Sequence, residues 1–485
     1  MQIKFLRNLA FLVFLNLLIK PFWIFGIDRT VQNMTGNEEY GLYFAMFNFS
    51  FLFQMFLDFG IVNFNNRRIS QNETLLETYL PNILSIKILL GFIYLLVTFA
   101  IALISGLDDR ALHFLFFMTI NQFLISMILY LRSNISALQY FVTDSILSVL
   151  DKFIMILICG SLLWLPLLNK EFQIEYFIYA QTIALVFTLM IVLIVVQWKA
   201  TRPKLKFDFQ FAVQLLRQTF PFALLGVLMS IYHRIDVVMI ERMLGKEGDE
   251  QAGIYAQGFR LLDAANMFGF LFASLLLPLF ARMLSEKKNI EDLLALSFKT
   301  IIVFAVSIAV VCFFYRQPIM EMLYHSNENR TADIFGILIF SFISICIMYV
   351  FGSLLTAHSS MKQLNRIALS GVVINITLNY FLITEYKAMG AAIATLITQS
   401  IVALAHIVIA KKIFSLQSNR KLLMNILLFV IAVLIITYST TLLHMDWKFN
   451  FIAAGCASVL TAILLGLIQR KQITDLWKRT NGIDS

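Results

Sequence analysis

The chain has 485 residues, of which 60% are hydrophobic and only 14% charged, with 47 phenylalanines and a formal net charge of +9. A soluble domain cannot bury that much apolar surface. Apolar runs long enough to cross a hydrocarbon core of about 30 Å recur along almost the whole chain. The composition therefore excludes a soluble globular protein and predicts an all-α polytopic membrane protein.

Hydropathy over windows of about 20 residues predicts fourteen transmembrane helices in chain order. The first six are expected at residues 9–29, 40–62, 82–104, 111–131, 145–168 and 174–197. Six more are expected at 219–241, 253–281, 293–315, 331–356, 367–384 and 388–410. A terminal pair follows at 422–443 and 450–469.

Lysine and arginine are divided unevenly between the two sides of these helices. The N-terminus and every second connection carry 24 of them, and the alternate connections carry nine. Basic residues accumulate in cytoplasmic loops, so both termini are predicted to be cytoplasmic. The positive charge is then a topology signal that faces anionic lipid headgroups, and no nucleic-acid partner is expected.

A weak internal repeat divides the chain. EEYGLYFAMFN at 38–48 aligns with EQAGIYAQGFR at 250–260, so that Gly41 matches Gly253 and Phe47 matches Phe259 at an offset of 212. Six helices are then followed by six more in the same orientation. Parallel repeats of this kind predict two lobes related by a pseudo-two-fold axis along the membrane normal, with a cavity between them and transport by alternating access.

The predicted domain boundaries follow from the repeat. The segment PKLKFDFQFAVQLLRQTF alternates charges with Phe and Leu and is too polar to span, which is typical of an interfacial amphipathic segment. We expect an N-terminal lobe at 1–198, a cytoplasmic amphipathic linker at 199–218, a C-terminal lobe at 219–412, and the terminal pair with a cytoplasmic tail at 413–485.

The chain offers no pattern typical of an enzyme. All connections between spans are short, and the four cysteines fall inside predicted helices without metal-ligand spacing. A membrane enzyme acting on glycolipids needs an extramembrane pocket with clustered catalytic groups. We therefore expect no catalytic residue, no metal site and no cofactor.

Charges inside the spans are the candidates for a functional site, because they are costly there and usually face a cavity or a partner. Lys20, Arg234 and Arg260 are basic, and a cavity that presents them suits an anionic substrate such as a phosphate group. Asp236 and Asp263 are expected to balance these charges, or to couple transport to Na⁺ or H⁺.

Structural roles are the alternative for the same residues. Arg260 and Asp263 are spaced i, i+3 and can form a salt bridge that locks helices. Asp58 precedes Gly60 at the inward end of the second predicted helix, near Arg67 and Arg68. That position predicts a cytoplasmic gate or a helix lock.

Two segments carry a family resemblance. IKPFWIFGIDRTVQNMTGNEEYGLYFAMFNFSFLFQMFLDFGIVNFNNRRIS at 19–70 resembles the opening of Wzx-type polysaccharide-biosynthesis flippases, of the superfamily that includes the MATE exporters and the lipid II flippase. The run at 354–399 resembles helices ten to twelve of that superfamily, with Asn375 and Asn379 one turn apart and small residues from Gly390 to Ala392. Such small residues permit close helix packing.

The resemblance implies a flippase that moves an undecaprenyl-diphosphate-linked oligosaccharide, of the O-antigen repeat-unit type, from the inner to the outer leaflet of the bacterial cytoplasmic membrane. It implies a polysaccharide polymerase and glycosyltransferases as functional partners. The alternative is a MATE-like multidrug exporter coupled to a cation, whose cavity should be acidic or aromatic. A membrane-embedded glycosyl enzyme is a third interpretation, weakened by the short outward loops.

Overall fold

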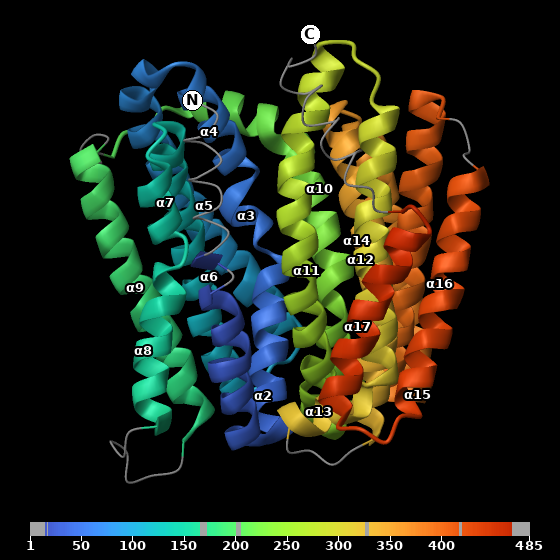
Figure 1. Cartoon of the computed structure of the whole chain (residues 1–485). Helices are drawn as coiled ribbons and strands as arrows, with labels where there is room; N and C mark the ends of the chain where they lie inside the picture. Colours follow the sequence, from blue (N-terminus) through green and yellow to red (C-terminus); the bar gives the residue numbers. More distant parts are fainter. Residues whose placement is uncertain are drawn as a thin grey trace. The chain divides into compact units, whose positions relative to one another are not determined.

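The computed structural model describes residues 15–16, 18–164, 172–199, 205–324, 329–416 and 420–467, and every structural statement below concerns these residues. Within them the regular structure is helical, and no strand occurs (Figure 1). The all-α fold predicted from the sequence is confirmed. Several basic residues used for the topology prediction lie outside the described residues: Lys4, Arg7, Lys170, Arg202, Lys204, Arg470, Lys471, Lys478 and Arg479.

The chain divides into two compact units, residues Met1–Ile254 and Tyr255–Ser485. The first unit contains the helices η1 (Trp23–Asp28), α2 (Arg29–Leu52), α3 (Met55–Asp58), α4 (Ile61–Gln71), η2 (Glu73–Leu75), α5 (Leu76–Ile104), α6 (Asp109–Ala137), α7 (Phe141–Leu147), α8 (Leu150–Trp164), α9 (Ile174–Lys199), α10 (Phe209–Met243) and η3 (Gly245–Glu247). Helix α11 (Gly248–Ser285) begins in the first unit and continues into the second.

The second unit contains the remaining helices, α12 (Glu291–Phe314), α13 (Arg316–Leu323), α14 (Asn329–Ala357), α15 (Met361–Phe414), α16 (Arg420–Thr441) and α17 (Trp447–Leu464). Apolar side chains of α12, α16 and α14 pack together there, with Phe429 and Val433 fully buried among them. Helix α15 packs along α14.

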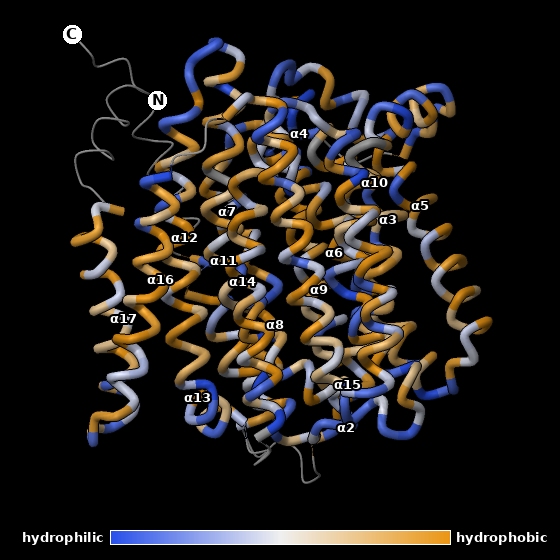
Figure 2. The backbone as a smooth tube through the Cα atoms, turned by 90° about the vertical axis from the view of Figure 1, so that its right-hand side faces the viewer, coloured by the Kyte–Doolittle hydropathy of each residue, from blue (hydrophilic) through white to orange (hydrophobic). Residues whose placement is uncertain are grey.

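Eleven helices in the described part of the chain are long and apolar enough to cross a membrane. One of them, α15, has 54 residues and is broken at Lys387 (φ 53°, ψ −134°), between the predicted spans 367–384 and 388–410. Figure 2 shows hydrophobic residues predominating along the long helices and hydrophilic residues at the turns. The protein is therefore a multi-pass membrane protein, while the number of fourteen spans stays a prediction.

Helix α6 lies at the centre of the first unit, where it packs against α2, α4, α5 and α9. Its residues Tyr130, Leu131 and Ile135 are completely buried in the core that these helices share. Close packing at this position explains the small polar residues of α6, because Ser and Thr allow helices to approach and can bond across the interface.

Helix α10 also belongs to the first unit and packs against α2, α3, α4 and α5. The sequence places this helix at the start of the second set of six. The grouping of the helices into two lobes and a terminal pair, and the linker at 199–218, stay predictions.

Candidate functional site

The second predicted span is not a continuous helix. Helix α2 ends at Leu52, the single turn α3 follows at Met55–Asp58, and α4 begins only at Ile61. Between them, Phe59 (φ 48°) and Gly60 (φ 72°) adopt left-handed backbone conformations. A break of this kind leaves backbone carbonyls without helical partners, and in a membrane the protein must satisfy them.

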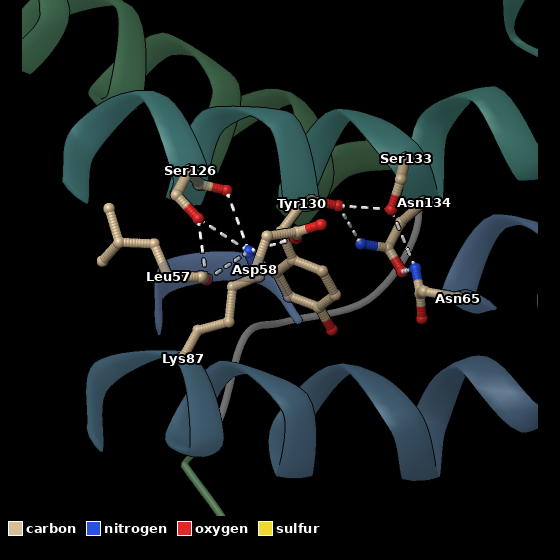
Figure 3. Close-up of polar contacts among 8 residues, drawn as sticks. All are labelled: Leu57, Asp58, Asn65, Lys87, Ser126, Tyr130, Ser133 and Asn134. Atoms are coloured by element: carbon tan, nitrogen blue, oxygen red, sulfur yellow. Dashed lines mark hydrogen bonds and ion pairs between the residues drawn. The ribbon is translucent and has the colours of Figure 1, made fainter. Parts of the chain in front are cut away.

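Lys87 of α5 satisfies one backbone carbonyl at this break, that of Leu57 (Figure 3). Its Nζ atom donates to the backbone oxygen of Leu57 at 3.0 Å, to Oδ1 of Asp58 at 2.9 Å and to Oγ of Ser126 at 2.7 Å. The Ser126 hydroxyl itself donates to the Leu57 oxygen at 3.0 Å. The side chain of Lys87 is only 1% exposed, whereas that of Asp58 is 35% exposed. A buried ammonium therefore joins α5 and α6 to the end of α3.

A second polar contact holds the next helix. Asn65 of α4 donates from Nδ2 to Oγ of Ser133 at 2.9 Å and to Oδ1 of Asn134 at 3.1 Å, both on α6. The Lys87 ammonium also lies 5.9 Å from the ring centroid of Tyr130, between the two contacts along α6 (Figure 3). The break is thus fixed to α6 on both of its sides.

Arg234 lies on α10 beside the end of α2. Its guanidinium carbon is 5.3 Å from the ring centroid of Phe51, the residue before the last of α2. The side chain is half-buried. An aromatic face attracts the guanidinium, while recognition of a phosphate uses the planar edge with its fork of donors. Asp236, two residues further along, is 1% exposed.

Lys20 lies just before η1, in a segment that packs against α7 and α8. Nδ2 of Asn16 donates to Oγ of Ser148 at 3.3 Å, and the Lys152 ammonium lies 5.0 Å from the Trp23 ring centroid. The carboxylate of Asp151 on α8 acts on the Lys20 ammonium electrostatically. Lys20 lacked an acid at helical spacing in the sequence, and the fold brings it near an acid of another helix that already pairs with Lys152 at 3.5 Å.

The remaining predicted residues lie on α11 and α4. Arg260 and Asp263 are half-buried and one turn apart on α11, in the second unit. Arg67 and Arg68 are exposed on α4, with Arg68 5.3 Å from the Phe64 ring centroid. The ion-pair partner of Asp58 is Lys87.

The sequence analysis singled out Asp58 but did not connect it with Lys87. A signal was present, because one lysine interrupts an otherwise apolar run in LSIKILLGF and an aspartate precedes a glycine in the span before it. Intramembrane charges of opposite sign usually pair. The signal could not specify the Leu57 carbonyl, since the break in the helix was not predicted.

The internal repeat has a counterpart in local geometry. Tyr43 and Phe47 stack in α2 with ring centroids 6.4 Å apart, and the matched pair Tyr255 and Phe259 stacks in α11 at 5.6 Å. The two segments therefore present matched aromatic pairs in the same arrangement.

Solved structures define the class of protein. The fold resembles that of the lipid II flippase MurJ in an inward closed conformation, with a TM-score of 0.74 and 15% identity over 97% of this chain and 99% of that one. An inward-facing multidrug resistance MATE transporter of the MOP superfamily matches with a TM-score of 0.63 and 12% identity, over 83% and 98%. A MOP superfamily transporter from Pyrococcus furiosus, whose binding pocket is of reverse polarity, matches with a TM-score of 0.59 and 12% identity. The match covers 84% of this chain and 94% of that one. The chain has the fold of a MOP-superfamily transporter.

Family models give a narrower assignment. The model described as polysaccharide biosynthesis protein matches residues 5–284, and the MatE model matches residues 221–381. The first match covers more than half of the chain, so the protein belongs to the polysaccharide biosynthesis protein family. The resemblance noted in the sequence is confirmed at the level of the family, and the solved structures that share the fold are a flippase and transporters. No curated protein matches the chain in sequence.

Proposed function

We propose that the protein flips an undecaprenyl-diphosphate-linked oligosaccharide, of the O-antigen repeat-unit type, from the inner to the outer leaflet of the bacterial cytoplasmic membrane. The family match over residues 5–284 is the observation that carries this proposal. The fold that the chain shares with the lipid II flippase MurJ supports it. Transport proceeds by alternating access, with both chain termini in the cytoplasm.

The intramembrane cations suit the diphosphate of such a substrate. Arg234, held on the face of Phe51, offers a planar fork of donors for a phosphate, and Lys20 contributes a point charge. Arg260 is the third substrate-binding residue in this proposal. Asp236 and Asp263 balance the positive charge between transport steps, or couple the cycle to Na⁺ or H⁺, and no cofactor is needed.

Three further residues are proposed to act where the substrate enters from the cytoplasmic side. Arg67 and Arg68 are exposed on α4 and can attract an anionic substrate, while Asp58 belongs to the break that precedes this helix. Glycosyltransferases that build the lipid-linked unit act before the flippase, and a polysaccharide polymerase acts after it.

The experiment that tests this function reconstitutes the purified protein in liposomes with a labelled undecaprenyl-diphosphate oligosaccharide and measures leaflet exchange. We expect exchange that requires the protein and falls at least tenfold in Arg234→Gln. Arg282→Gln is the matched control, because Arg282 is 59% exposed and bonds Glu286 one turn away. Absence of exchange with folded protein, several glycans and ion gradients would contradict the proposal.

A cation-coupled multidrug exporter is the second candidate, because the MatE model matches residues 221–381 and a MATE transporter shares the fold. In this case a cationic substrate should drive Na⁺ or H⁺ flux across the same liposomes. Such flux, together with an absence of oligosaccharide exchange, would favour the exporter.

A further inference from the structure

The oxygen atoms around the Lys87 ammonium form the ligand set of a monovalent cation. Four of them lie around Nζ: the Leu57 carbonyl at 3.0 Å, Oδ1 of Asp58 at 2.9 Å, and the hydroxyl and carbonyl of Ser126 at 2.7 and 3.4 Å. Two carbonyls, one carboxylate and one hydroxyl therefore converge on one buried point. The single carboxylate charge matches a single positive charge.

The position of this cage is one where transporters bind cations. Interrupted membrane helices expose backbone carbonyls, and the C-terminal ends of their segments carry partial negative charge that favours a cation. Leu57 and Asp58 are the last residues of α3, immediately before the left-handed Phe59 and Gly60. The Leu57 carbonyl and the Asp58 carboxylate, at the C-terminal end of α3, thus point at the ammonium.

A further polar group lies beside the cage. Gln122 of α6 is 1% exposed, and neither of its amide heteroatoms has a hydrogen-bond partner among the described residues. It lies four positions before Ser126 and therefore on the same face of the helix, one turn away. Its oxygen is a candidate ligand for an ion that enters once the lysine side chain is removed.

We infer that this cage is a monovalent-cation site whose permanent occupant is the Lys87 ammonium. The covalently attached cation holds the broken second helix to α5 and α6, so this part of the fold needs no Na⁺ or K⁺ from solution. When the amine is removed and the oxygens are kept, the site takes an alkali cation or a small alkylammonium ion. The inference goes beyond the proposed function and does not depend on the nature of the transported substrate.

The test measures thermal unfolding of the purified full-length protein in NaCl, KCl, methylammonium chloride and choline chloride at equal ionic strength. The parent should gain no stability in Na⁺ or methylammonium, relative to choline, beyond the gain that its Asp58→Asn variant also shows. Lys87→Ala should unfold at a lower temperature in choline and recover roughly 5 °C in a saturable manner with Na⁺ or methylammonium. Lys87→Met removes the charge but fills the space, so it should be destabilised equally in every salt.

The carboxylate provides a further control. Adding Asp58→Asn to Lys87→Ala should abolish the recovery, because the cage then has no net negative charge. Lys87→Ser, which adds a hydroxyl ligand, is the second variant and should respond as Lys87→Ala does.

Three outcomes would overturn the inference. The first is an equal unfolding temperature of Lys87→Ala in Na⁺, methylammonium and choline. The second is a rise in the unfolding temperature of the parent in Na⁺ that Asp58→Asn abolishes, because the cation in the cage would then come from solution. The third is failure of both Lys87→Ala and Lys87→Ser to fold in every salt, since no dissolved cation would then replace the amine.

Discussion

Gly41 of α2 and Gly253 of α11 lie where the backbones of their two helices touch. A Cβ atom on Gly41 would be 1.7 Å from the Asp249 carbonyl oxygen and 2.7 Å from the Gly253 nitrogen. A Cβ on Gly253 would be 2.0 Å from the Asn37 carbonyl oxygen. The internal repeat matches these two glycines with each other, so equivalent positions of the two segments meet in a contact that only glycine permits.

The contact predicts that Gly41→Ala destabilises the protein. The new methyl group meets backbone atoms rather than a movable side chain, and overpacking of this kind costs about 1–3 kcal/mol. Gly226→Ala is the control, because Gly226 is a helical glycine with nothing within 4 Å of its Cβ position. Thermal unfolding of both variants checks the prediction; equal stability would show that α2 and α11 can separate slightly without cost.

Much of this fold could be predicted from the sequence. Long apolar runs determine membrane-spanning helices, because each run must satisfy its backbone within itself. The small-residue run at Gly390–Ala392 marked a close contact, and a Cβ on Gly390 would indeed lie 2.0 Å from the Leu382 carbonyl oxygen. The repeat was detectable because close backbone contact and ring stacking constrain residue type at single positions, as at Gly41 and Phe47.

The break between α2 and α4 could not be predicted in the same way. FLFQMFLDFG reads as a continuous apolar helix, and Phe59 is an unfavourable residue for a left-handed conformation. Its conformation is imposed by tertiary contacts, above all by the bonds from Lys87 and Ser126 to the Leu57 carbonyl. For the same reason the partner of Asp58 could not be chosen between Lys87 and the nearby arginines.

The Asp58–Lys87 pair predicts an energetic coupling that can be measured. Lys87→Met should destabilise the protein by about 3 kcal/mol, at the low end for a broken buried pair, because the remaining Asp58 carboxylate is 35% exposed and can be hydrated. Asp58→Asn should lower the free energy of unfolding by a smaller amount, since an amide oxygen still accepts a hydrogen bond from the ammonium.

A double-mutant cycle isolates this coupling. The combined Asp58→Asn and Lys87→Met variant should be less destabilised than the sum of the single variants by about 1–3 kcal/mol, as expected for residues in contact. Asp144→Asn combined with Lys87→Met is the comparison. Asp144 pairs with Arg132 at 2.9 Å, so the destabilisation caused by Asp144→Asn should simply add to that caused by Lys87→Met. Additivity in the first cycle would contradict an energetic role for the pair.

The aromatic support of Arg234 predicts a graded loss of transport. Phe51→Leu keeps an apolar side chain of similar volume but removes the ring face under the guanidinium, a contact worth about 0.5–1 kcal/mol where it is partly exposed. We expect leaflet exchange to fall roughly two- to fivefold, less than in Arg234→Gln. Phe92→Leu is the control, because Phe92 is 60% exposed on α5. An unchanged rate in Phe51→Leu would show that Arg234 is positioned by other contacts.

The electrostatic relationship between Lys20 and Asp151 predicts opposite effects of two substitutions. If Lys20 binds an anionic headgroup, the Asp151 carboxylate competes with that headgroup for the ammonium. Asp151→Asn should then lower the substrate concentration for half-maximal exchange, and Lys20→Gln should raise it, with both proteins near the parent in thermal stability. The competition is between charges in a low-dielectric region, so a change of roughly tenfold, corresponding to 1.4 kcal/mol, is reasonable in each direction. A purely structural role of the two charges gives a different result, because both variants would then lose stability and neither would bind substrate more tightly.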